Sequence, residues 1–365
     1  MQASGAPISF ARGAPSLDIV DVQGLSEAAH RAFADDPAAT VGYGTAVGFA
    51  PLRAWIAERH GVAPEQVLVT NGSMQADAFL FSLLVDAGDA VVVEAPTYDR
   101  TLLNLRGRGA DLHPIALETD GIDVDAVEAL LASGIRPTLA HIIPNFQNPA
   151  GYTLSASKRT RLLALAAEYG MTIFEDDPYI SIRFEGESLP TMLEQDTGES
   201  VVYASSFSKT VCPGIRVGYL VGPRELIARV QALATNTYIS PNMVAQSIVN
   251  QFCRSGRLES SVATVRAALR ERRDALVAAL RRELPEARFE PPQGGYFMWV
   301  ELPDSIDVAA LESASGDRGV AFVKGTDFLL DGGSHALRLA YSGVTPAEID
   351  EGVSRLADAW RSLAT

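Results

Sequence analysis

The sequence predicts an α/β fold with one large domain and a smaller α+β domain towards the C-terminal end. Two observations support this prediction. Between about residues 67 and 221, short runs rich in Val and Ile, without polar alternation, recur between stretches of helical periodicity. That pattern is typical of a largely parallel sheet covered on both faces. Beyond Pro223 the pattern turns helical, and strands return only from Tyr296 onward.

Seven strands are expected in the large domain, because seven short apolar runs lie there between turn-forming residues. A helix is expected at residues 50–58, ahead of the first strand. Helical periodicity recurs between strands, for example at 76–85 and 155–169, as the crossovers of a parallel sheet require. The expected strands are residues 67–70, 90–94, 112–116, 139–143, 171–175, 201–204 and 217–221.

The C-terminal part begins with a long amphipathic stretch at residues 258–284 that carries many Arg and Glu residues. Its heptad spacing is not sustained, so we expect a connecting helix rather than a coiled coil. The remainder mixes expected strands with expected helices: strands at 296–300, 319–322 and 336–341, and helices near 308–315 and 346–363.

Three units follow from these patterns. Residues 1–40, rich in Gly, Pro and Asp, are expected to form an arm that packs on the small domain. Residues 41–257 are the expected large domain, which also carries the candidate cofactor site described below. Residues 258–365 are the expected connecting helix and small C-terminal domain.

Composition narrows the classes of function. The 365 residues carry a net charge of −15, which disfavours a nucleic-acid partner. With two cysteines there is no disulfide framework, which favours a reducing, cytoplasmic location. The N-terminus lacks the pattern of a signal peptide, and no apolar run is long enough to span a membrane. The five histidines show no metal-ligand spacing, so no metal site is expected.

The principal candidate for chemistry is Lys209, which follows the expected strand 201–204 within a run of serines. A lysine in a poorly solvated pocket loses its proton more easily, and its neutral amine can form a Schiff base with a carbonyl. Ser206, Ser208 and Arg216 offer the hydroxyl and guanidinium donors that a phosphate group binds. An amine beside a phosphate site fits pyridoxal phosphate. The alternative is an ordinary surface lysine in a serine-rich loop.

Other polar residues follow the ends of successive expected strands, where open α/β sheets bind ligands. Ser73 opens a helix and offers an anion site, or only an N-cap. Tyr98 can stack on a flat ring, or lie in the core. Asn148 lies in an amide-rich turn and can donate to a ring oxygen, or simply form the turn. Asp176 can pair with a protonated pyridine nitrogen, or act as a cap or solvated acid.

At this point the sequence resembles a known family. It looks like a fold-type I pyridoxal-phosphate enzyme of aminotransferase class I/II, nearest the branch of aminoadipate and kynurenine aminotransferases. The resemblance runs from Phe10 to about Leu363. The motifs that carry it are Ser206-x-Ser208-Lys209 with Arg216-x-Gly218, Asn148-Pro149-Ala150-Gly151, Asp176-x-x-Tyr179 and Leu337-Arg338-Leu339.

The resemblance implies a fold-type I architecture, a transamination between an L-α-amino acid and a 2-oxo acid, and a role for each matching residue. Lys209 would carry the internal aldimine and move the proton between the substrate α-carbon and the cofactor. Asp176 would pair with the pyridine nitrogen, Asn148 and Tyr179 would bond the ring oxygen, and Tyr98 would stack on the ring. The phosphate would be held by Ser73, Met74, Gln75, Ser206, Ser208 and Arg216.

The resemblance also implies a homodimer and a substrate clamp. Tyr43 matches a tyrosine that reaches across a dimer interface to the partner's phosphate. Arg338 matches the arginine that binds the substrate α-carboxylate, where its planar fork orients the α-C–H bond towards Lys209. Gly13, within the segment 12–17, would close over the substrate. Arg12 could then bind an acidic side chain, or instead be a surface or dimer-interface arginine.

Three alternatives stay open. Ser206 and Lys209 also match the S-x-x-K motif of serine acyl enzymes, but the K-T-G element is missing, and Ser206 follows a strand instead of opening a helix. Some relatives are effector-sensing modules of transcription regulators, but no DNA-binding domain precedes residue 10, and the acidic charge opposes DNA contact. The same cofactor site could also support a lyase, decarboxylase or oxidase reaction.

Overall fold

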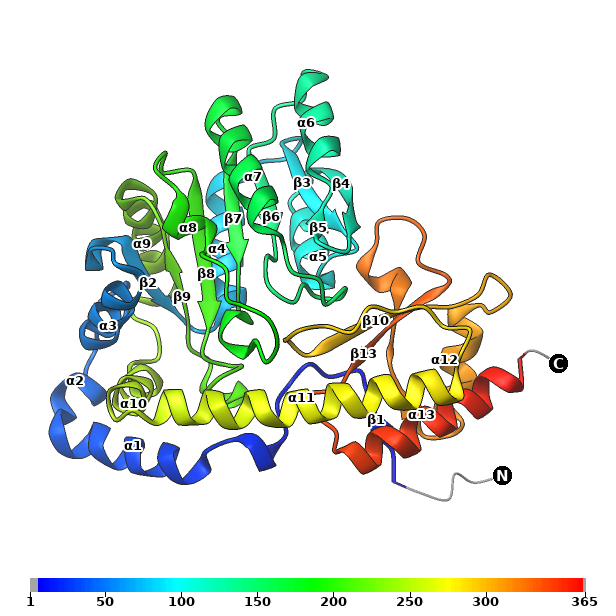
Figure 1. Ribbon diagram of the computed structural model, residues 1–365. Coiled ribbons are helices and arrows are strands. Elements are labelled where there is room, and N and C mark those ends of the chain that lie inside the picture. Colours follow the sequence, from blue (N-terminus) through cyan, green and yellow to red (C-terminus); the bar gives the residue numbers. More distant parts are fainter. Residues whose placement is uncertain (1–5, 364–365) are drawn as a thin grey trace.

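A computed structural model describes residues 6–363, and its centre is an eight-stranded sheet (Figure 1). All seven expected strands of the large domain are present, so the predicted α/β fold is confirmed. The eighth strand is a two-residue addition at one edge that the sequence pattern did not indicate. In spatial order the strands are β2 (Val67–Thr70), β9 (Gly218–Val221), β8 (Val201–Ser206), β7 (Thr172–Asp176), β6 (Leu139–Ile142), β3 (Ala90–Ala95), β4 (Asp111–Glu118) and β5 (Gly121–Ile122).

The sheet is mainly parallel. The neighbours from β8 through β7, β6 and β3 to β4 run parallel, whereas β9 runs antiparallel to both β2 and β8. Consecutive residues of a strand face opposite sides, and Val91, Val92 and Val93 of β3 are each fully buried. Both faces of the sheet are therefore covered, which explains why the strands lack polar alternation.

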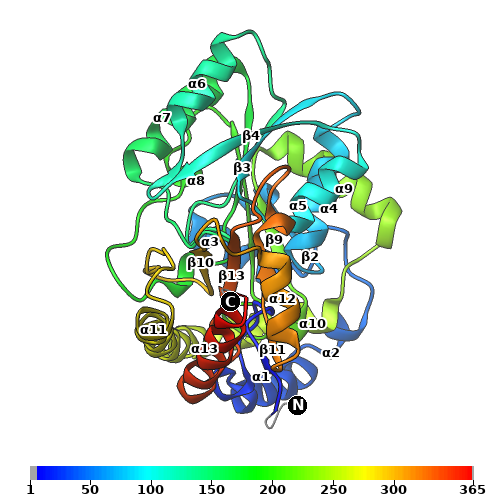
Figure 2. The same ribbon diagram turned by 90° about the vertical axis from the view of Figure 1, so that its right-hand side faces the viewer.

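Helices cover the two faces in separate layers (Figure 2). Each layer has its own apolar core against the sheet, one built around Leu80 and Val230 and the other around Leu131 and Leu162. One layer contains α4 (Ser73–Leu84), α5 (Asp99–Gly107) and α9 (Arg224–Tyr238), and the other contains α6 (Val124–Ala132), α7 (Ala156–Tyr169) and α8 (Met192–Gln195).

The N-terminal segment contacts both parts of the molecule. Its strand β1 (Ile8–Ser9) pairs in parallel with β11 (Val320–Ala321), whereas α1 (Val22–Asp35) packs along α10 (Met243–Arg254) beside the large sheet. Helix α1 was not expected from the sequence; α2 (Pro37–Val41) and α3 (Ala50–His60) follow it. Residues 1–5 of the predicted arm lie outside the described residues, and the predicted domain boundaries stay a prediction.

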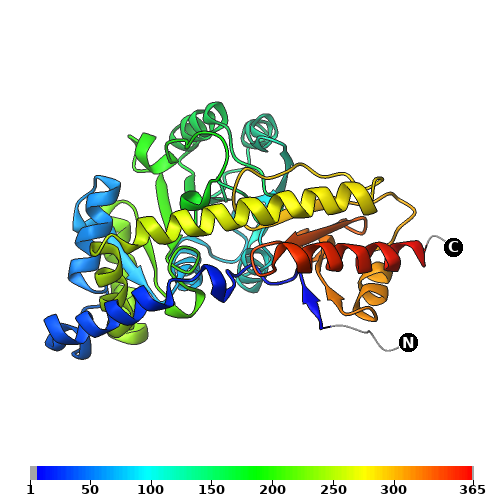
Figure 3. The same ribbon diagram turned by 60° about the horizontal axis from the view of Figure 1, so that its bottom comes forward.

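Helix α11 (Arg257–Glu283) runs along the whole molecule and packs against α13 (Pro346–Arg361) (Figure 3). The smaller C-terminal sheet lies along the C-terminal half of this helix, with which it shares one core. The stretch expected as a strand at 319–322 contains only the two-residue strand β11, and a separate short strand follows it. This part contains β10 (Phe297–Glu301), β13 (Ala336–Ala340) and β12 (Val323–Lys324) in one sheet, with α12 (Val308–Gly316) beside it.

Short 3-10 turns complete the elements, at Leu17–Ile19, Pro64–Gln66, Ile180–Ile182, Pro213–Ile215 and Gly325–Phe328. Among the described helices, none combines the length and apolar character needed to cross a bilayer.

Candidate active site

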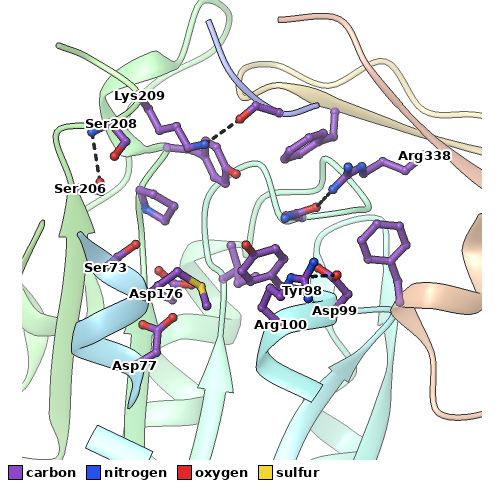
Figure 4. A pocket seen from close by; sticks show the side chains of 18 of the residues that line it. Ser73, Asp77, Tyr98, Asp99, Arg100, Asp176, Ser206, Ser208, Lys209 and Arg338 are labelled. Atoms are coloured by element: carbon purple, nitrogen blue, oxygen red, sulfur yellow. Dashed lines mark hydrogen bonds and ion pairs between the residues drawn. The ribbon is translucent and has the colours of Figure 1, made fainter. Parts of the chain in front are cut away.

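A cavity of about 490 Å³ opens between the carboxyl ends of the central strands and the smaller C-terminal sheet (Figure 4). The order of the strands reverses beside it, because β3 is followed by β4 on one side of the sheet, whereas β6 is followed by β7 on the other. Such a switch point is where open α/β sheets bind ligands. The expected site residues that line this cavity are Gly13, Ser73, Met74, Tyr98, Asn148, Asp176, Tyr179, Ser206, Ser208, Lys209, Arg216 and Arg338.

Lys209 is set apart from the other two lysines of the chain. Lys158 pairs with Glu118 and Asp120, and Lys324 pairs with Glu312. Within residues 6–363, no carboxylate lies within ion-pair distance of Lys209, whose Nζ instead donates to the backbone oxygen of Gly13 at 2.8 Å. Its amine is therefore the one that can react without first breaking an ion pair.

The surroundings of Lys209 favour its neutral form. The pKa of Lys209 is lowered to about 8, mainly by burial and then by the positive charges of Arg338 and Arg216, against the opposing effect of Asp176. The rings of Tyr179 and Tyr296 lie 5.6 Å and 5.2 Å from its Nζ. A substantial fraction of neutral amine is thus present near pH 8, as a Schiff-base lysine needs.

An anion site lies beside Lys209, at the start of α4. Ser73 is the first residue of this helix and follows Gly72, whose φ of +88° places the backbone amides at the cavity. A side chain at Gly72 would collide with the guanidinium of Arg216, so the close approach requires glycine. Arg216 Nη1 donates to Ser208 Oγ at 3.1 Å, and Ser206 Oγ accepts from the Ser208 amide at 3.1 Å. Helix amides, hydroxyls and a guanidinium together suit a phosphate group.

Asp176 supplies a carboxylate with an unused acceptor. It lies at the end of β7, is 6% exposed, and its Oδ1 is buried without a hydrogen-bond partner among the described residues. Its Oδ2 lies 3.6 Å from His141 Nε2. A buried carboxylate oxygen without a partner is costly, so a ligand N–H that reaches it would be favoured. A protonated pyridine nitrogen fits this position.

The turn after β6 is held by a buried network that fixes Asn148. Asn145 Nδ2 donates to Asp177 at 2.8 Å, and the fully buried Arg159 donates to Asn145 Oδ1 at 3.0 Å. Asn148 Oδ1 accepts from Arg338 Nη1 at 2.9 Å. The amide Nδ2 of Asn148 is then the donor that this residue can offer to a ligand.

Arg338 projects from β13 into the opposite wall of the cavity. Its guanidinium carbon lies 4.2 Å from the ring centre of Phe297 and 4.8 Å from that of Phe328. Nη2 donates to the backbone oxygen of Ala11 at 2.7 Å, and burial lowers the pKa of Arg338 from its ordinary value. Two aromatic rings and Asn148 therefore hold a planar cation ready to bind a carboxylate.

Three expected site residues do not line the cavity. The side chain of Gln75 accepts from the amide of Asn71 at 2.9 Å, so it closes the turn before α4. Arg12 is exposed, although its neighbours Ala11 and Gly13 line the cavity. Tyr43 is 91% exposed. The roles expected for these residues stay predictions.

Other lining residues were not expected from the sequence. Asp99 and Arg100 directly follow Tyr98, so their position next to an expected residue was a usable signal. Asp77 lies one helical turn beyond Ser73, which was also a signal. Nothing in the sequence indicated the remaining ones, which are Ala11, Ile143, Pro178, Phe297, Val323, Asp327 and Phe328.

Among residues 6–363, no group of three or more His, Cys, Asp or Glu side chains is arranged to hold a metal ion.

Comparison with known proteins identifies the family. The family model for aminotransferase class I and II matches residues 7–356. The chain is 35% identical over 361 residues to a 2-aminoadipate transaminase from Thermus thermophilus, covering 98% of this chain and 90% of that protein. The structure of an alpha-aminoadipate aminotransferase from Thermus thermophilus, complexed with N-(5'-phosphopyridoxyl)-L-leucine, superimposes with a TM-score of 0.94 at 34% identity, covering 98% and 93% of the two chains.

A kynurenine aminotransferase from Pyrococcus horikoshii superimposes with a TM-score of 0.93 at 31% identity, covering 98% of this chain and 92% of that one. These matches extend over nearly the whole chain and agree with the cavity, which presents an amine, an anion site and an unpaired carboxylate oxygen together. The chain belongs to the class I and II aminotransferases, and it transfers amino groups with pyridoxal phosphate as its cofactor.

Proposed function

We propose that the cavity around Lys209 is the transamination site and that the residues lining it have the roles that the sequence motifs predict. The observation that carries this proposal is the position of Lys209. Its amine has no ion-pair partner among the described residues, and it shares one cavity with the Ser73–Arg216 anion site and with Asp176. When bound, pyridoxal phosphate supplies an aldehyde that condenses with amines and a ring that accepts electrons.

Several residues would hold the cofactor. The amides and hydroxyls at Ser73, Ser206 and Ser208, with Arg216, would bind its phosphate. Asp176 would accept the ring N–H through Oδ1. Asn148 and Tyr179 would bond the ring oxygen, and Tyr98 would stack on the ring. Met74 lies at the anion site, whereas Gln75 would contribute through its backbone, because its side chain is committed to Asn71.

Lys209 would also act as the acid and base of the reaction. A group with a pKa near the working pH both accepts and returns protons efficiently, and the pKa of Lys209 is lowered to about 8 by burial. Once its amine is free, Lys209 would take the proton from the substrate α-carbon and return it elsewhere in the product. To do so it must leave the oxygen of Gly13.

Arg338 would bind the α-carboxylate of the amino acid or 2-oxo acid. Its Nη2 donates to the oxygen of Ala11, so a carboxylate would displace this segment of backbone and gain a two-pronged, charge-assisted contact. The predicted closure of residues 12–17 over the substrate fits this position. The aromatic contacts of Phe297 and Phe328 keep the guanidinium in place during the exchange.

The experiment that tests the function is a panel of amino donors offered with 2-oxoglutarate or pyruvate, in which the new amino acid and free ammonia are both measured. We expect a new amino acid in proportion to donor consumed. Ammonia without a new amino acid would favour a lyase or oxidase reaction, and carbon dioxide release would favour a decarboxylase. The panel should include 2-aminoadipate, kynurenine and aromatic amino acids, for which the relatives are named.

Arg12 is proposed to bind an acidic substrate side chain when the 12–17 segment closes. Arg12→Ala should then lower kcat/KM for 2-aminoadipate and leave the value for an aromatic donor unchanged. An equal loss for both donors would assign Arg12 to the surface or to a dimer interface.

The protein is proposed to act as a homodimer with shared active sites. Tyr43 and Ile239 are 91% and 63% exposed, and Ile239 has a φ of +67°, which is strained for a β-branched residue. The two segments are neighbours, because Tyr238 Oη donates to the oxygen of Ala46 at 3.0 Å. An exposed apolar patch of this kind fits a contact with a second copy, in which Tyr43 would reach the partner's phosphate.

Mixed dimers test this sharing. Lys209→Ala and Tyr43→Ala variants should each be impaired alone, but a hybrid dimer contains one site with both residues intact. Activity that appears on mixing would support the shared site. Sedimentation as a monomer, or mixing without recovery, would contradict it.

The cytoplasmic location is a proposal supported by two unpaired cysteines, Cys212 and Cys253. Cell fractionation would test it. The net charge of −15 supports the proposal that nucleic acids are not partners, and a filter-binding assay at low salt would test that.

A further inference from the structure

A second acid lies at the floor of the cavity, beneath Asp176. Asp77 follows Ser73 by one turn of α4 and is 3% exposed (Figure 4). Its Oδ1 is buried without a hydrogen-bond partner among the described residues, as is Oδ1 of Asp176. Two carboxyl groups with unused oxygens therefore line one cavity. The cofactor roles proposed above give Asp77 no function.

The groups around Asp77 explain why it lacks a cation. The face of α4 that packs on β8, β9 and α9 is apolar, with Leu80 in the same core cluster as Ala204, Leu220 and Val230. Among residues 6–363, the titratable groups that interact with Asp77 are Asp176 on β7 and Tyr98 ahead of α5, and His141 on β6 and Glu94 on β3 lie near Asp176. Lys209 lies at the opposite end of the cavity, as Figure 4 shows.

Two neighbouring buried carboxylates cannot both be ionised without a large electrostatic cost. Burial raises the pKa of Asp77 well above its ordinary value, and the charge of Asp176 raises it further. Asp176 Oδ2 faces His141 Nε2 at 3.6 Å, and its Oδ1 faces the proposed position of the cationic ring nitrogen. The proton of the pair therefore belongs on Asp77.

We propose that Asp77 is a protonated positioning residue that donates a hydrogen bond to Asp176, so that the two acids share one proton beneath the cofactor ring. The shared proton gives the buried carboxyl group of Asp77 a partner. It also uses part of the acceptor strength of Asp176, which tunes how firmly Asp176 holds the ring N–H. This role rests on the proposed function of Asp176, whereas the protonation of Asp77 does not.

The protonation is tested on the apoprotein, where no activity is involved. Asp77→Asn keeps the shape and a donor but carries no titratable proton. We expect the wild-type apoprotein at neutral pH to show a carboxylic-acid C=O band in the infrared that is weaker in Asp77→Asn; Glu94, whose pKa is raised to about 8 by burial, contributes to the band in both proteins. Asp304→Asn, a change in an exposed loop, should keep the band. A wild-type spectrum without the band, or one that Asp77→Asn leaves unchanged, would overturn the proposal.

Stability gives an independent readout. A carboxyl group whose pKa is raised in the folded state favours folding below its unfolded pKa, and this contribution is lost as pH rises towards the folded pKa. The melting temperature of wild-type apoprotein should therefore fall relative to Asp77→Asn as pH rises above about 4. Parallel curves for the two proteins across that range would contradict a protonated Asp77.

The effect of Asp77 on the bond between Asp176 and the ring N–H is tested with pyridoxal phosphate bound. The visible absorbance of the bound cofactor is measured as a function of pH. Asp77→Asn should keep a wild-type spectrum at neutral pH but lose any alkaline transition due to Asp77, and Asp77→Leu, without a donor, should shift the spectrum at neutral pH. Identical titrations for all three proteins would refute the tuning. Asp176→Asn separates the two hypotheses: if it leaves the spectrum unchanged, the proposed role of Asp176 fails, while the infrared result on Asp77 still stands.

Discussion

Replacing Arg338 by alanine tests how the site recognises its substrates. The guanidinium is 7% exposed, lies between Phe297 and Phe328, and reaches Asn148 and Ala11 through separate nitrogens. Removing it deletes the proposed carboxylate contact and the bond to Asn148, whereas the contact between Arg216 and Ser208 at the anion site stays in place. We expect a loss specific to substrates that carry an α-carboxylate.

The magnitude follows from the bonds involved. A hydrogen bond to a charged group contributes about 1.5–3 kcal/mol, so a two-pronged contact offers about 3–6 kcal/mol. Part of this is offset, because binding breaks the bond between Arg338 and the oxygen of Ala11. A net loss of about 2–5 kcal/mol remains. Because each 1.36 kcal/mol changes a rate constant tenfold, kcat/KM should fall by about 30-fold to about 5,000-fold.

The assay compares kcat/KM for an amino acid with that for a primary amine of the same side chain that lacks the carboxylate. Arg338→Ala should abolish the preference for the amino acid and leave the amine unchanged, with KM rising more than kcat falls. Arg338→Lys keeps the charge but not the planar fork and should recover only part of the loss. Arg361→Ala is the matched control, because Arg361 is an exposed residue on α13 that pairs with Glu283 and Asp358.

Folding of the variant is checked by its melting temperature and by the absorbance of the bound cofactor. A similar loss for the amine and the amino acid, in a protein that still binds cofactor, would refute the assignment of Arg338 to the carboxylate. An unchanged KM would remove it from the substrate site.

Three further predictions follow from the same contacts. Lys209→Ala should lose the visible absorbance of bound cofactor and at least about 10²–10⁴-fold of the activity, the usual effect of removing a general base, and retained turnover would show that another base acts. The rate at which the apoprotein captures pyridoxal phosphate should rise with pH and level off above about 8, since the pKa of Lys209 is lowered to about 8 and only the neutral amine condenses. A rate that keeps rising up to the ordinary pKa of lysine would contradict this lowering. Arg159→Ala should destabilise the protein by about 3–5 kcal/mol in urea unfolding, because it removes the cation beside the buried Glu175 and the donor to Asn145; a loss below about 1 kcal/mol would contradict the network.

The strands of the large sheet could be predicted because their signal is local. Six of the seven strands are buried along nearly all of their length, as β3 shows at Val91 to Val93, whereas β4 is only partly buried. The two-residue strand β5 and the break between β11 and β12 were missed, since they depend on pairing with distant residues. Helix α1 was also missed, although Asp21 caps it by accepting from the Gly24 amide.

The site was predicted where its residues directly follow strands, as Asp176 and Lys209 do. Gln75 was expected among the phosphate ligands, but its side chain accepts from Asn71, a local contact that residue type does not reveal. Phe297 and Phe328 come from separate segments of the C-terminal part, and only the folded chain brings them to Arg338. In the sequence, Asp77 is an ordinary acidic residue of a helix. Its burial and its proximity to Asp176 are visible only in the folded chain.

The central claim is that Lys209 bonds covalently to the cofactor, and chemical trapping tests it most directly. Protein loaded with pyridoxal phosphate is reduced with borohydride, digested, and mapped by mass spectrometry. The chain has only three lysines, so the assignment is unambiguous. We expect the phosphopyridoxyl label on the peptide that contains Lys209. A label on Lys158 or Lys324 with Lys209 unmodified would contradict the covalent bond to Lys209.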